Sequence, residues 1–307
     1  MAGLNFGKKV WFDGKTIDFE NAQVSILSHA LHYGSCVFEG LRTYKTKKGS
    51  AIFRLEPHIR RLYESAKIYR MDIPLSQKEF CDKVCETVRA NNFDACYVRP
   101  FVFRGLGDLG LNPLSSPIHV SIAVWEWGAY LGADSIEAGI DVKFSSWNRI
   151  APNTFPAMAK AAGNYLHSQL MKMEAVLDGY AESIILDSHG MISEGSGENI
   201  FIIRDGKIYT PPMGASILLG ITRDVVKVLA RDMEIEVIEE NIPREFLTIA
   251  DEAFFTGTAA EITPIRSVDK IPIGNGKRGP ITEKIQERFF RLVKGEEPDL
   301  FGWLKYL

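Results

Sequence analysis

Residues 153–165 read NTFPAMAKAAGNY and set one lysine, Lys160, among small and apolar residues. Lysine is usually exposed, and it is almost never fully buried unless it is paired. Ala159 and Ala161 leave space around the amine, and Gly163 permits a close backbone contact. A lysine kept from water becomes a usable nucleophile, because desolvation lowers its pKa from the ordinary value of about 10.4. The stretch alone also fits a surface lysine on a loop. Other parts of the sequence are needed to show whether Lys160 belongs to a site.

The bulk composition is that of a globular protein that can bury a core. The chain has 307 residues, of which 46% are apolar and 24% are charged, which suits one large or two ordinary domains. The net charge is -3 with both signs interspersed, so nucleic-acid and anionic-membrane surfaces are disfavoured. No apolar run approaches the roughly 18–20 residues that span a bilayer. The four cysteines form no CxxC pair and no secretory signal is visible, so we expect a cytoplasmic protein.

Downstream of Lys160, the sequence predicts alternating helices and strands. Apolar residues recur at helical spacing, and Gly179 ends the first helix. Turn residues separate short runs rich in β-branched side chains, which are typical of strands. The predicted helices span 163–178, 222–233, 243–252 and 280–295, and the predicted strands span 182–187, 199–204, 207–212 and 234–242. The next stretch, 253–265, is predicted to contain a strand end and a turn.

Upstream of Lys160, the sequence predicts a mixture of strands and helices. Asp13 and Gly14 predict a β-hairpin, Pro57 opens a helix, and Ser76 with Glu79 forms the capping box of another helix. Two further strands are predicted over 97–104 and 119–127, before a glycine-rich segment. We therefore predict a mixed α/β (α+β) fold with a smaller N-terminal α/β domain over 1–126, an interdomain loop over 127–138 and a larger C-terminal α/β domain over 139–307.

Gly105, Gly107 and Gly110 form a GxGxxG pattern. In a dinucleotide-binding fold this pattern opens a helix whose N-terminus faces the pyrophosphate. Here Pro113 and Pro117 stand where that helix should run, and proline lacks the N–H donor that a helix needs. We therefore predict a flexible loop and not a dinucleotide site.

His29 and His32 lie three residues apart and could be metal ligands. No cluster of cysteines or carboxylates stands near them in the sequence. We interpret them as packed, hydrogen-bonded histidines and predict no metal site.

Two stretches of the sequence are suited to binding anions. Gly220, Ile221 and Thr222 lie at the start of a predicted helix, where unpaired N–H groups and the positive end of the helix dipole can hold a phosphate. GTAAEI (257–262) sets small residues at a strand end, where a turn can expose backbone donors. Thr222 could instead be a simple helix cap, and the second stretch an ordinary turn.

Glu194 lies in ISEGSGENIF, between two predicted strands, from where an acid can reach into a site or remain in water. A lysine among small residues, a phosphate seat, an anion-binding turn and a lone carboxylate together describe the needs of pyridoxal 5′-phosphate. That cofactor requires an amine for its aldehyde, donors for its phosphate and an acid for its pyridine nitrogen.

Longer stretches resemble the fold-type IV pyridoxal-phosphate aminotransferases, and specifically the branched-chain amino-acid aminotransferases. The order and spacing of these stretches are kept over nearly the whole chain, with local departures at Leu106–Ser116 and after Gly295. The stretches are SHALHYGSCVFEGLR (28–42), HIRRLYESAK (58–67), YVRPFVF (97–103), WGAYLG (127–132), SSWNRIAPNTFPAMAKAAGNY (145–165), ISEGSGENIF (192–201), LLGITRD (218–224) and FTGTAAEITPIRS (255–267).

The resemblance implies a role for each residue that would hold the cofactor. Lys160 would bind pyridoxal 5′-phosphate covalently, Glu194 would pair with its pyridine nitrogen, and Tyr165 would hydrogen-bond its ring oxygen. The residues expected at its phosphate are Arg61, Gly220, Ile221, Thr222 and Thr258.

The resemblance also implies a substrate pocket. The substrate α-carboxylate would lie on the turn at Thr258 and Ala259, near Tyr97, and Arg99 with Tyr130 would take the second carboxylate of glutamate. The remaining pocket residues are Phe38, Gly40, Trp127, Tyr165 and Ala260, with Tyr33 at the edge and borrowed across a subunit interface.

The activity that this resemblance implies is reversible, ping-pong transamination between leucine, isoleucine or valine and 2-oxoglutarate. The same lysine, acid and phosphate seat also serve D-amino-acid aminotransferases and aminodeoxychorismate lyases, but WGAY, YVRP and GTAAE favour the branched-chain family. A non-catalytic protein that binds the cofactor is a third alternative. The partners expected are small amino acids, 2-oxo acids and further copies of the chain, as a dimer or a hexamer.

Overall fold

The computed structural model describes residues 5–128, 131–132 and 134–307, so the predicted substrate residue Tyr130 lies outside the described residues. Contacts divide the chain into two compact units. The first unit comprises Met1–Trp127, Ala159–Asn164 and Leu292–Leu307, and the second unit comprises Gly128–Met158 and Tyr165–Arg291. The units are not contiguous in sequence, in contrast to the predicted domains, because two later segments pack with the first unit.

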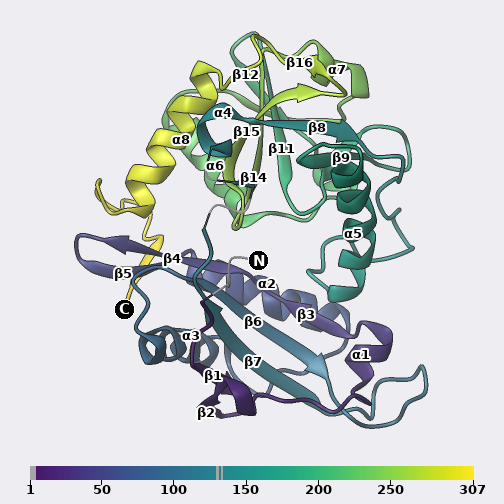
Figure 1. Ribbon diagram of the computed structural model, residues 1–307, viewed down its shortest axis with the longest axis vertical. Helices are drawn as coiled ribbons and strands as arrows, with labels where there is room; N and C mark the ends of the chain where they lie inside the picture. Colours follow the sequence, from purple (N-terminus) through teal and green to yellow (C-terminus); the bar gives the residue numbers. More distant parts are fainter. Residues whose placement is uncertain (1–4, 129–130, 133) are drawn as a thin grey trace. The chain divides into compact units, whose positions relative to one another are not determined.

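The first unit is built on one sheet with the strand order β17-β5-β4-β6-β7-β1-β2, in which β3 also pairs with β6 (Figure 1). The hairpin between the first two strands is confirmed, and its turn residues Asp13 and Gly14 have φ angles of 43° and 90°, as the tight hairpin turn requires. The strands are β1 (Lys9–Phe12), β2 (Lys15–Asp18), β3 (Cys36–Phe38), β4 (Leu41–Thr46), β5 (Gly49–Phe53), β6 (Tyr97–Arg104), β7 (Ile118–Trp125) and β17 (Leu304–Tyr306).

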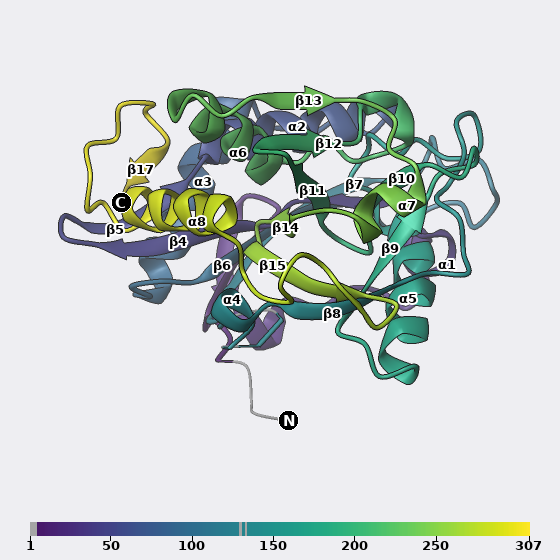
Figure 2. The ribbon, with the colours of Figure 1, turned by 90° about the horizontal axis from the view of Figure 1, so that it is seen from above.

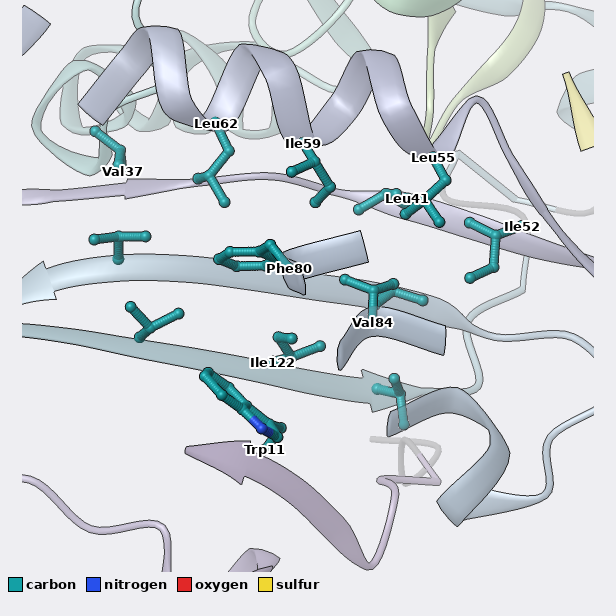
Figure 3. Close-up of a cluster of buried hydrophobic side chains, with 14 of the residues drawn as sticks. Trp11, Val37, Leu41, Ile52, Leu55, Ile59, Leu62, Phe80, Val84 and Ile122 are labelled. Atoms are coloured by element: carbon teal, nitrogen blue, oxygen red, sulfur yellow. The ribbon is translucent and has the colours of Figure 1, made fainter. Parts of the chain in front are cut away.

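The helices of the first unit are η1 (Phe19–Asn21), α1 (His29–Tyr33), α2 (Leu55–Ile68) and α3 (Gln77–Asn91). Of these, α2 and α3 supply buried apolar side chains to the core. Leu55, Ile59 and Leu62 follow helical spacing on α2 and are fully buried, and Figure 3 shows them pointing toward the strands. Burying each of these side chains contributes about 1.5–3 kcal/mol. The capping box of Ser76 and Glu79 at the start of α3 is confirmed.

The second unit is built on a sheet with the order β10-β9-β8-β15-β14-β11-β12-β13, with β16 paired to β15 (Figure 2). Three of its strand pairs are parallel, namely β8 with β9, β8 with β15, and β12 with β13. The strands are β8 (Ile140–Phe144), β9 (Glu182–Leu186), β10 (Ile192–Gly195), β11 (Asn199–Arg204), β12 (Lys207–Thr210), β13 (Val237–Glu239), β14 (Glu252–Gly257), β15 (Glu261–Val268) and β16 (Ile271–Pro272).

The helices of the second half of the chain are α4 (Ser135–Ala138), α5 (Ala162–Leu177), η2 (Met213–Ala215), α6 (Ile221–Asp232), α7 (Arg244–Thr248) and α8 (Pro280–Val293). The predicted helix over 243–252 is shorter, because Glu252 already begins β14. The stretch GTAAEI (257–262), expected to hold a strand end and a turn, does so, since a turn at residues 258–260 reverses the chain between the paired strands β14 and β15. The mixed α/β fold class is confirmed. No helix of the described residues is long and apolar enough to cross a membrane.

Candidate active site

The backbone around Lys160 is fixed on both sides within the first unit. The Lys160 N–H donates to Ser65 Oγ at 2.9 Å, and the Lys160 carbonyl accepts from the Phe38 N–H at 3.0 Å. The next residue, Ala161, forms a β-bridge with Val37 of β3. The amine Nζ lies 5.1 Å from the centroid of the Phe38 ring, and the residue is half-buried. The position from which the lysine side chain starts is therefore set by a helix and a strand.

A fully buried carboxylate, Glu39, lies next to this segment and was not singled out by the sequence. His58 Nδ1 lies 2.6 Å from Glu39 Oε2, and Arg61 donates from Nε and Nη2 at 2.6 and 2.9 Å. Burial alone would raise the pKa of Glu39, but Arg61 and His58 outweigh it and hold that pKa well below its usual range. Burial lowers the pKa of His58, and the Glu39 carboxylate opposes this shift without cancelling it. Glu39 therefore orients Arg61, the predicted phosphate ligand.

The predicted substrate residues of the first unit lie together. The Arg99 guanidinium lies 4.8 Å from the centroid of the Phe38 ring and 5.4 Å from that of Tyr97. The Tyr97 ring in turn meets the Trp127 ring edge-on, with centroids 4.7 Å apart. A Cβ at Gly40 would lie 1.8 Å from the Tyr97 hydroxyl, so only glycine fits there. The result is an aromatic group around one arginine.

Arg99 carries a buried polar atom that requires a partner. Its Nε has no hydrogen-bond partner among the described residues, whereas buried donors in native proteins are nearly always paired. A ligand carboxylate is the natural partner of such a guanidinium. The geometry is therefore that expected of a side chain that receives an anionic substrate.

Tyr33 lies at the surface of the first unit, beside the glycine pattern. Its hydroxyl donates to the Leu109 carbonyl at 2.9 Å, and 48% of the residue is exposed. His29 is hydrogen-bonded to Ser35 and to the Gly110 carbonyl, and no metal-binding cluster is present in the part of the chain that the structure describes. Residues 105–117 form turns and bends without a helix, so the pattern there is a loop.

In the second unit, Glu194 is buried on β10 and its carboxylate is fully engaged. Arg149 Nη2 lies 2.7 Å from Oε1, and Oε2 accepts from Asn199 Nδ2 and from the Leu218 N–H, both at 3.0 Å. Arg149 is itself anchored, because its Nε donates to the Ser216 carbonyl at 3.1 Å. Arg149 lies within the stretch SSWNRIAP (145–152), but no role was predicted for it. Little in the sequence indicates that Arg149 pairs with Glu194, because no local pattern links two residues so distant in the chain.

The predicted phosphate seat is the start of α6. Gly220 is the N-cap residue and supplies no side-chain cap, and the buried Ile221 and Thr222 begin the helix. Thr222 is therefore not the N-cap, and the first N–H groups of the helix remain suited to an anion. A Cβ at Gly220 would lie 1.9 Å from Asn199 Oδ1, so glycine is required where the helix begins beside the Glu194 network.

The turn between β14 and β15 contains Thr258, Ala259 and Ala260. Thr263 Oγ1 donates to the Ala260 carbonyl at 2.7 Å and stiffens the turn. Tyr165 lies half-buried in the first turn of α5. The second unit thus holds the predicted acid, the helix start, the turn and the tyrosine.

The family model for amino-transferase class IV matches residues 36–268. The chain belongs to the class IV aminotransferases. It is 50% identical over 296 residues to the branched-chain-amino-acid aminotransferase of Escherichia coli (strain K12), covering 96% of each chain. The corresponding protein of Pseudomonas aeruginosa is 47% identical over 294 residues, which are 96% of this chain and 95% of that one.

Solved structures of branched-chain aminotransferases share the fold of this class IV aminotransferase. The crystal structure of the Escherichia coli protein matches with a TM-score of 0.96 and 50% identity over 97% of this chain and 99% of that one. The Thermobaculum terrenum protein, whose crystal structure is of the PLP-form, matches with a TM-score of 0.92 and 33% identity over 98% of each chain. The family resemblance and the fold-type IV prediction are confirmed.

The residues of this aminotransferase fit pyridoxal 5′-phosphate. The helix start at Gly220 lacks a side-chain cap and can receive a phosphate. Glu194 offers a carboxylate whose orientation is already set, which suits a protonated pyridine nitrogen. Lys160 offers the amine that the aldehyde of the cofactor requires. Each chemical feature of the cofactor therefore has a partner of the right type.

Proposed function

We propose that this chain transfers the amino group of leucine, isoleucine or valine to 2-oxoglutarate, giving the branched-chain 2-oxo acid and L-glutamate in a reversible ping-pong reaction. Relatives named for branched-chain amino acids are 50% identical over 96% of the chain. The observation that carries the proposal is the fixed backbone of Lys160, held by Ser65 and Phe38. A lysine that binds a cofactor covalently and then moves protons on it requires such a fixed position.

Lys160 performs the proton transfers. When bound, pyridoxal 5′-phosphate withdraws electrons from the substrate Cα, so that the Cα proton can leave. The Lys160 amine would accept this proton as a general base. Its conjugate acid would then donate the proton as a general acid, and the same two roles would run in reverse with 2-oxoglutarate.

Glu194 holds the proton of the pyridine nitrogen. Arg149 and Asn199 fix the orientation of its carboxylate, so little rearrangement is needed when the nitrogen binds. A hydrogen bond of this charged kind contributes about 1.5–3 kcal/mol. Tyr165 donates a hydrogen bond to the ring oxygen of the cofactor.

The phosphate binds to donors of three kinds. The start of α6 at Gly220, Ile221 and Thr222 supplies backbone N–H groups, Thr258 supplies a hydroxyl, and Arg61 supplies a guanidinium. The bidentate bond with Glu39 keeps Arg61 in one orientation, so the arginine loses little side-chain entropy when it binds the phosphate.

The substrate pocket accepts both an apolar and an acidic side chain. The substrate α-carboxylate binds at Thr258 and Ala259 with Tyr97, and Arg99 with Tyr130 binds the second carboxylate of glutamate. The aromatic rings around Arg99 satisfy its charge when leucine is bound, whereas an isolated buried charge would reject leucine. The apolar side chain contacts Phe38, Gly40, Trp127, Tyr165 and Ala260.

The assembly that we propose is a homo-oligomer, either a dimer or a hexamer as a trimer of dimers. The exposed Tyr33 reaches the substrate of a neighbouring subunit in this assembly. We also propose a cytoplasmic location, in keeping with four cysteines that are all free thiols.

A panel of L- and D-amino acids with 2-oxoglutarate tests the proposed function. The expected result is glutamate formation with leucine, isoleucine and valine, at rates well above those with D-alanine. Activity confined to D-alanine would contradict the proposal. Lys160→Ala is the control for the chemistry, and it should retain cofactor noncovalently while losing nearly all turnover.

A further inference from the structure

Four buried carboxylates lie between residues 182 and 198 of the second unit, namely those of Glu182, Asp187, Glu194 and Glu198. Asp187 accepts the N–H groups of His189 and Met191 in a turn, and among the described residues only Glu182 and Glu194 pair with a cation. Glu182 is fully buried and bonds to Lys172 Nζ at 2.8 Å. Glu194 is 5% exposed and pairs with Arg149 at 2.7 Å. Glu198 is 4% exposed, and no lysine or arginine of the described residues lies within ion-pair distance of it. The proposed reaction uses only Glu194 of these four acids.

Glu198 is located where the two proposed binding elements meet within the second unit. Its Oε2 lies 2.9 Å from the position that a Cβ would occupy at Gly195, the residue after Glu194. Its Cγ lies 3.7 Å from the corresponding position at Gly257, at the start of the turn that contains Thr258. The Glu198 side chain therefore packs against both β10, which carries Glu194, and the end of β14, where the turn of Thr258 begins.

The hydrogen bonds of Glu198 are few. The Gly197 N–H donates to its Oε2 at 3.0 Å, and its backbone carbonyl accepts from the Gly195 N–H at 2.7 Å. An ionised carboxylate can accept about four hydrogen bonds, and burying one without a cation costs several kcal/mol in practice unless the group takes up a proton. The surroundings of Glu198 are therefore better suited to a neutral acid.

The acidic groups around Glu198 also favour its neutral form. The pKa of Glu198 is raised to about 8, mainly by burial and also by the like charges of Glu182 and Glu194. The Gly197 N–H and the Lys172 ammonium oppose this shift without cancelling it. A pKa of about 8 makes the neutral acid the main form of Glu198 at pH 7, and Glu198 takes a negative charge at alkaline pH.

We propose that Glu198 is a positioning residue that, as a neutral acid, packs the strand of Glu194 against the turn of Thr258 and Ala259. Its ionisation weakens the binding of anions at that turn. The inference deepens the proposed function and rests on it, because that function assigns the substrate carboxylate to the turn. Uncharged glutamine reproduces the shape of the neutral acid, so Glu198→Gln removes only the ionisation.

Unfolding of the cofactor-free protein tests the buried acid independently of activity. A carboxylic acid whose pKa is raised on folding stabilises the protein at low pH, and this stabilisation is lost as pH rises from about 4.5 to about 8. Relative to Glu198→Gln, the folded-to-unfolded ratio of the wild type should fall by up to tenfold per pH unit over this range. Parallel curves for the two proteins would overturn the inference. The exposed Glu240→Gln is the matched control, and its curve should parallel the wild type.

Kinetics across pH test the effect on the turn. The KM of the wild type for leucine should rise above pH 8 more than its kcat falls, and this rise should be absent from Glu198→Gln. A rise of equal size in the variant would overturn the positioning role even if the unfolding curves differ. If the wild type had no transaminase activity but the unfolding curves differed, the proposed function would be refuted. The inference that Glu198 is a buried neutral acid would still hold.

The wild type alone gives a further readout if Glu198→Gln does not fold. The infrared spectrum of the cofactor-free protein should show the carbonyl band of a protonated carboxyl group at pH 7, and this band should disappear as the pH passes about 8. A spectrum without such a band at pH 7 would overturn the inference.

Discussion

Arg149 Nη2 lies 2.7 Å from Glu194 Oε1, and both side chains are almost completely buried. Breaking a buried ion pair by removing one partner leaves an uncompensated charge and typically costs about 3–5 kcal/mol. The pair therefore matters for the fold as well as for the cofactor. Replacement of both partners by uncharged residues removes that penalty but also removes the acid that the pyridine nitrogen needs.

Arg149→Met should destabilise the protein by about 3–5 kcal/mol, because it leaves Glu194 buried without its cation. The double variant Arg149→Met/Glu194→Gln should recover most of this stability and still show very low turnover. Urea unfolding and steady-state kinetics measure the two effects. Lys207→Ala breaks an exposed pair with Glu236 and is the control, with little expected change in stability. Recovery of activity in the double variant would contradict the role of Glu194.

Ser65→Ala should impair the positioning of Lys160. The Ser65 hydroxyl accepts the Lys160 N–H, and a buried donor left without a partner costs about 1–3 kcal/mol. We expect kcat to fall by about tenfold, with a smaller change in KM, because the amine that moves the proton is displaced from its best geometry.

Thr87→Val is the matched control for Ser65→Ala. The Thr87 hydroxyl is also buried, but it donates to the Lys83 carbonyl within α3. Its loss should affect stability without a tenfold fall in kcat. Equal kinetic effects of the two variants would show that Ser65 acts only through general stability.

Glu39→Gln should change the response of stability to acid. The folded-state pKa of Glu39 is lowered, mainly by Arg61 and His58 acting against burial, so the carboxylate contributes stability above the unfolded pKa of about 4.5. That contribution is lost as pH falls below about 4.5. The variant should be less stable at pH 7 by about 3–5 kcal/mol, since Arg61 loses its partner, and its stability should depend less on pH in the acid range.

Unfolding by urea from pH 3 to pH 7 measures this acid response. The exposed Glu64, which pairs with Arg60 on α2, supplies the control variant Glu64→Gln. That variant should follow the wild-type curve at all pH values. A Glu39→Gln curve of wild-type shape would show that the carboxylate does not stabilise the fold through Arg61.

Local sequence signals predicted the elements that depend on neighbouring residues. The hairpin at Asp13 and Gly14, the capping box at Ser76 and the helix start near Gly220 all follow from side chains and backbone within a few positions. The helix α7 is shorter than local signals predicted. Helical spacing over 243–252 was sufficient to predict a long helix, but pairing of β14 with β11 takes its last residue into the sheet.

The polar groups that support the site could not be predicted in the same way. Glu39 contacts Arg61, which lies 22 positions away, and Arg149 contacts Glu194 across a still longer stretch of chain. Apolar periodicity reports which face of an element is buried, but it does not report which charges meet there. Glu198 is a third example, because an acid in a glycine-rich loop is usually exposed and only the fold shows its burial.

Gly220→Ala should damage the cofactor site through two neighbouring features at once. The added Cβ would lie 1.9 Å from Asn199 Oδ1, so Asn199 has to move, and it donates to the carboxylate of Glu194. The same change alters the start of α6, where the phosphate is proposed to bind. We expect the Kd for pyridoxal 5′-phosphate to rise by at least tenfold, with a smaller effect on stability.

Titration of the cofactor-free variant with pyridoxal 5′-phosphate, followed by absorbance, measures this Kd. Gly214→Ala is the matched control, because a Cβ at Gly214 meets no atom within 4 Å. Its Kd should stay at the wild-type value. Inorganic phosphate then separates the two causes, since it contacts the helix start but not the acid. If phosphate binds the variant as tightly as the wild type, displacement of Asn199 and Glu194 accounts for the loss; if phosphate binding weakens in parallel, the helix start does.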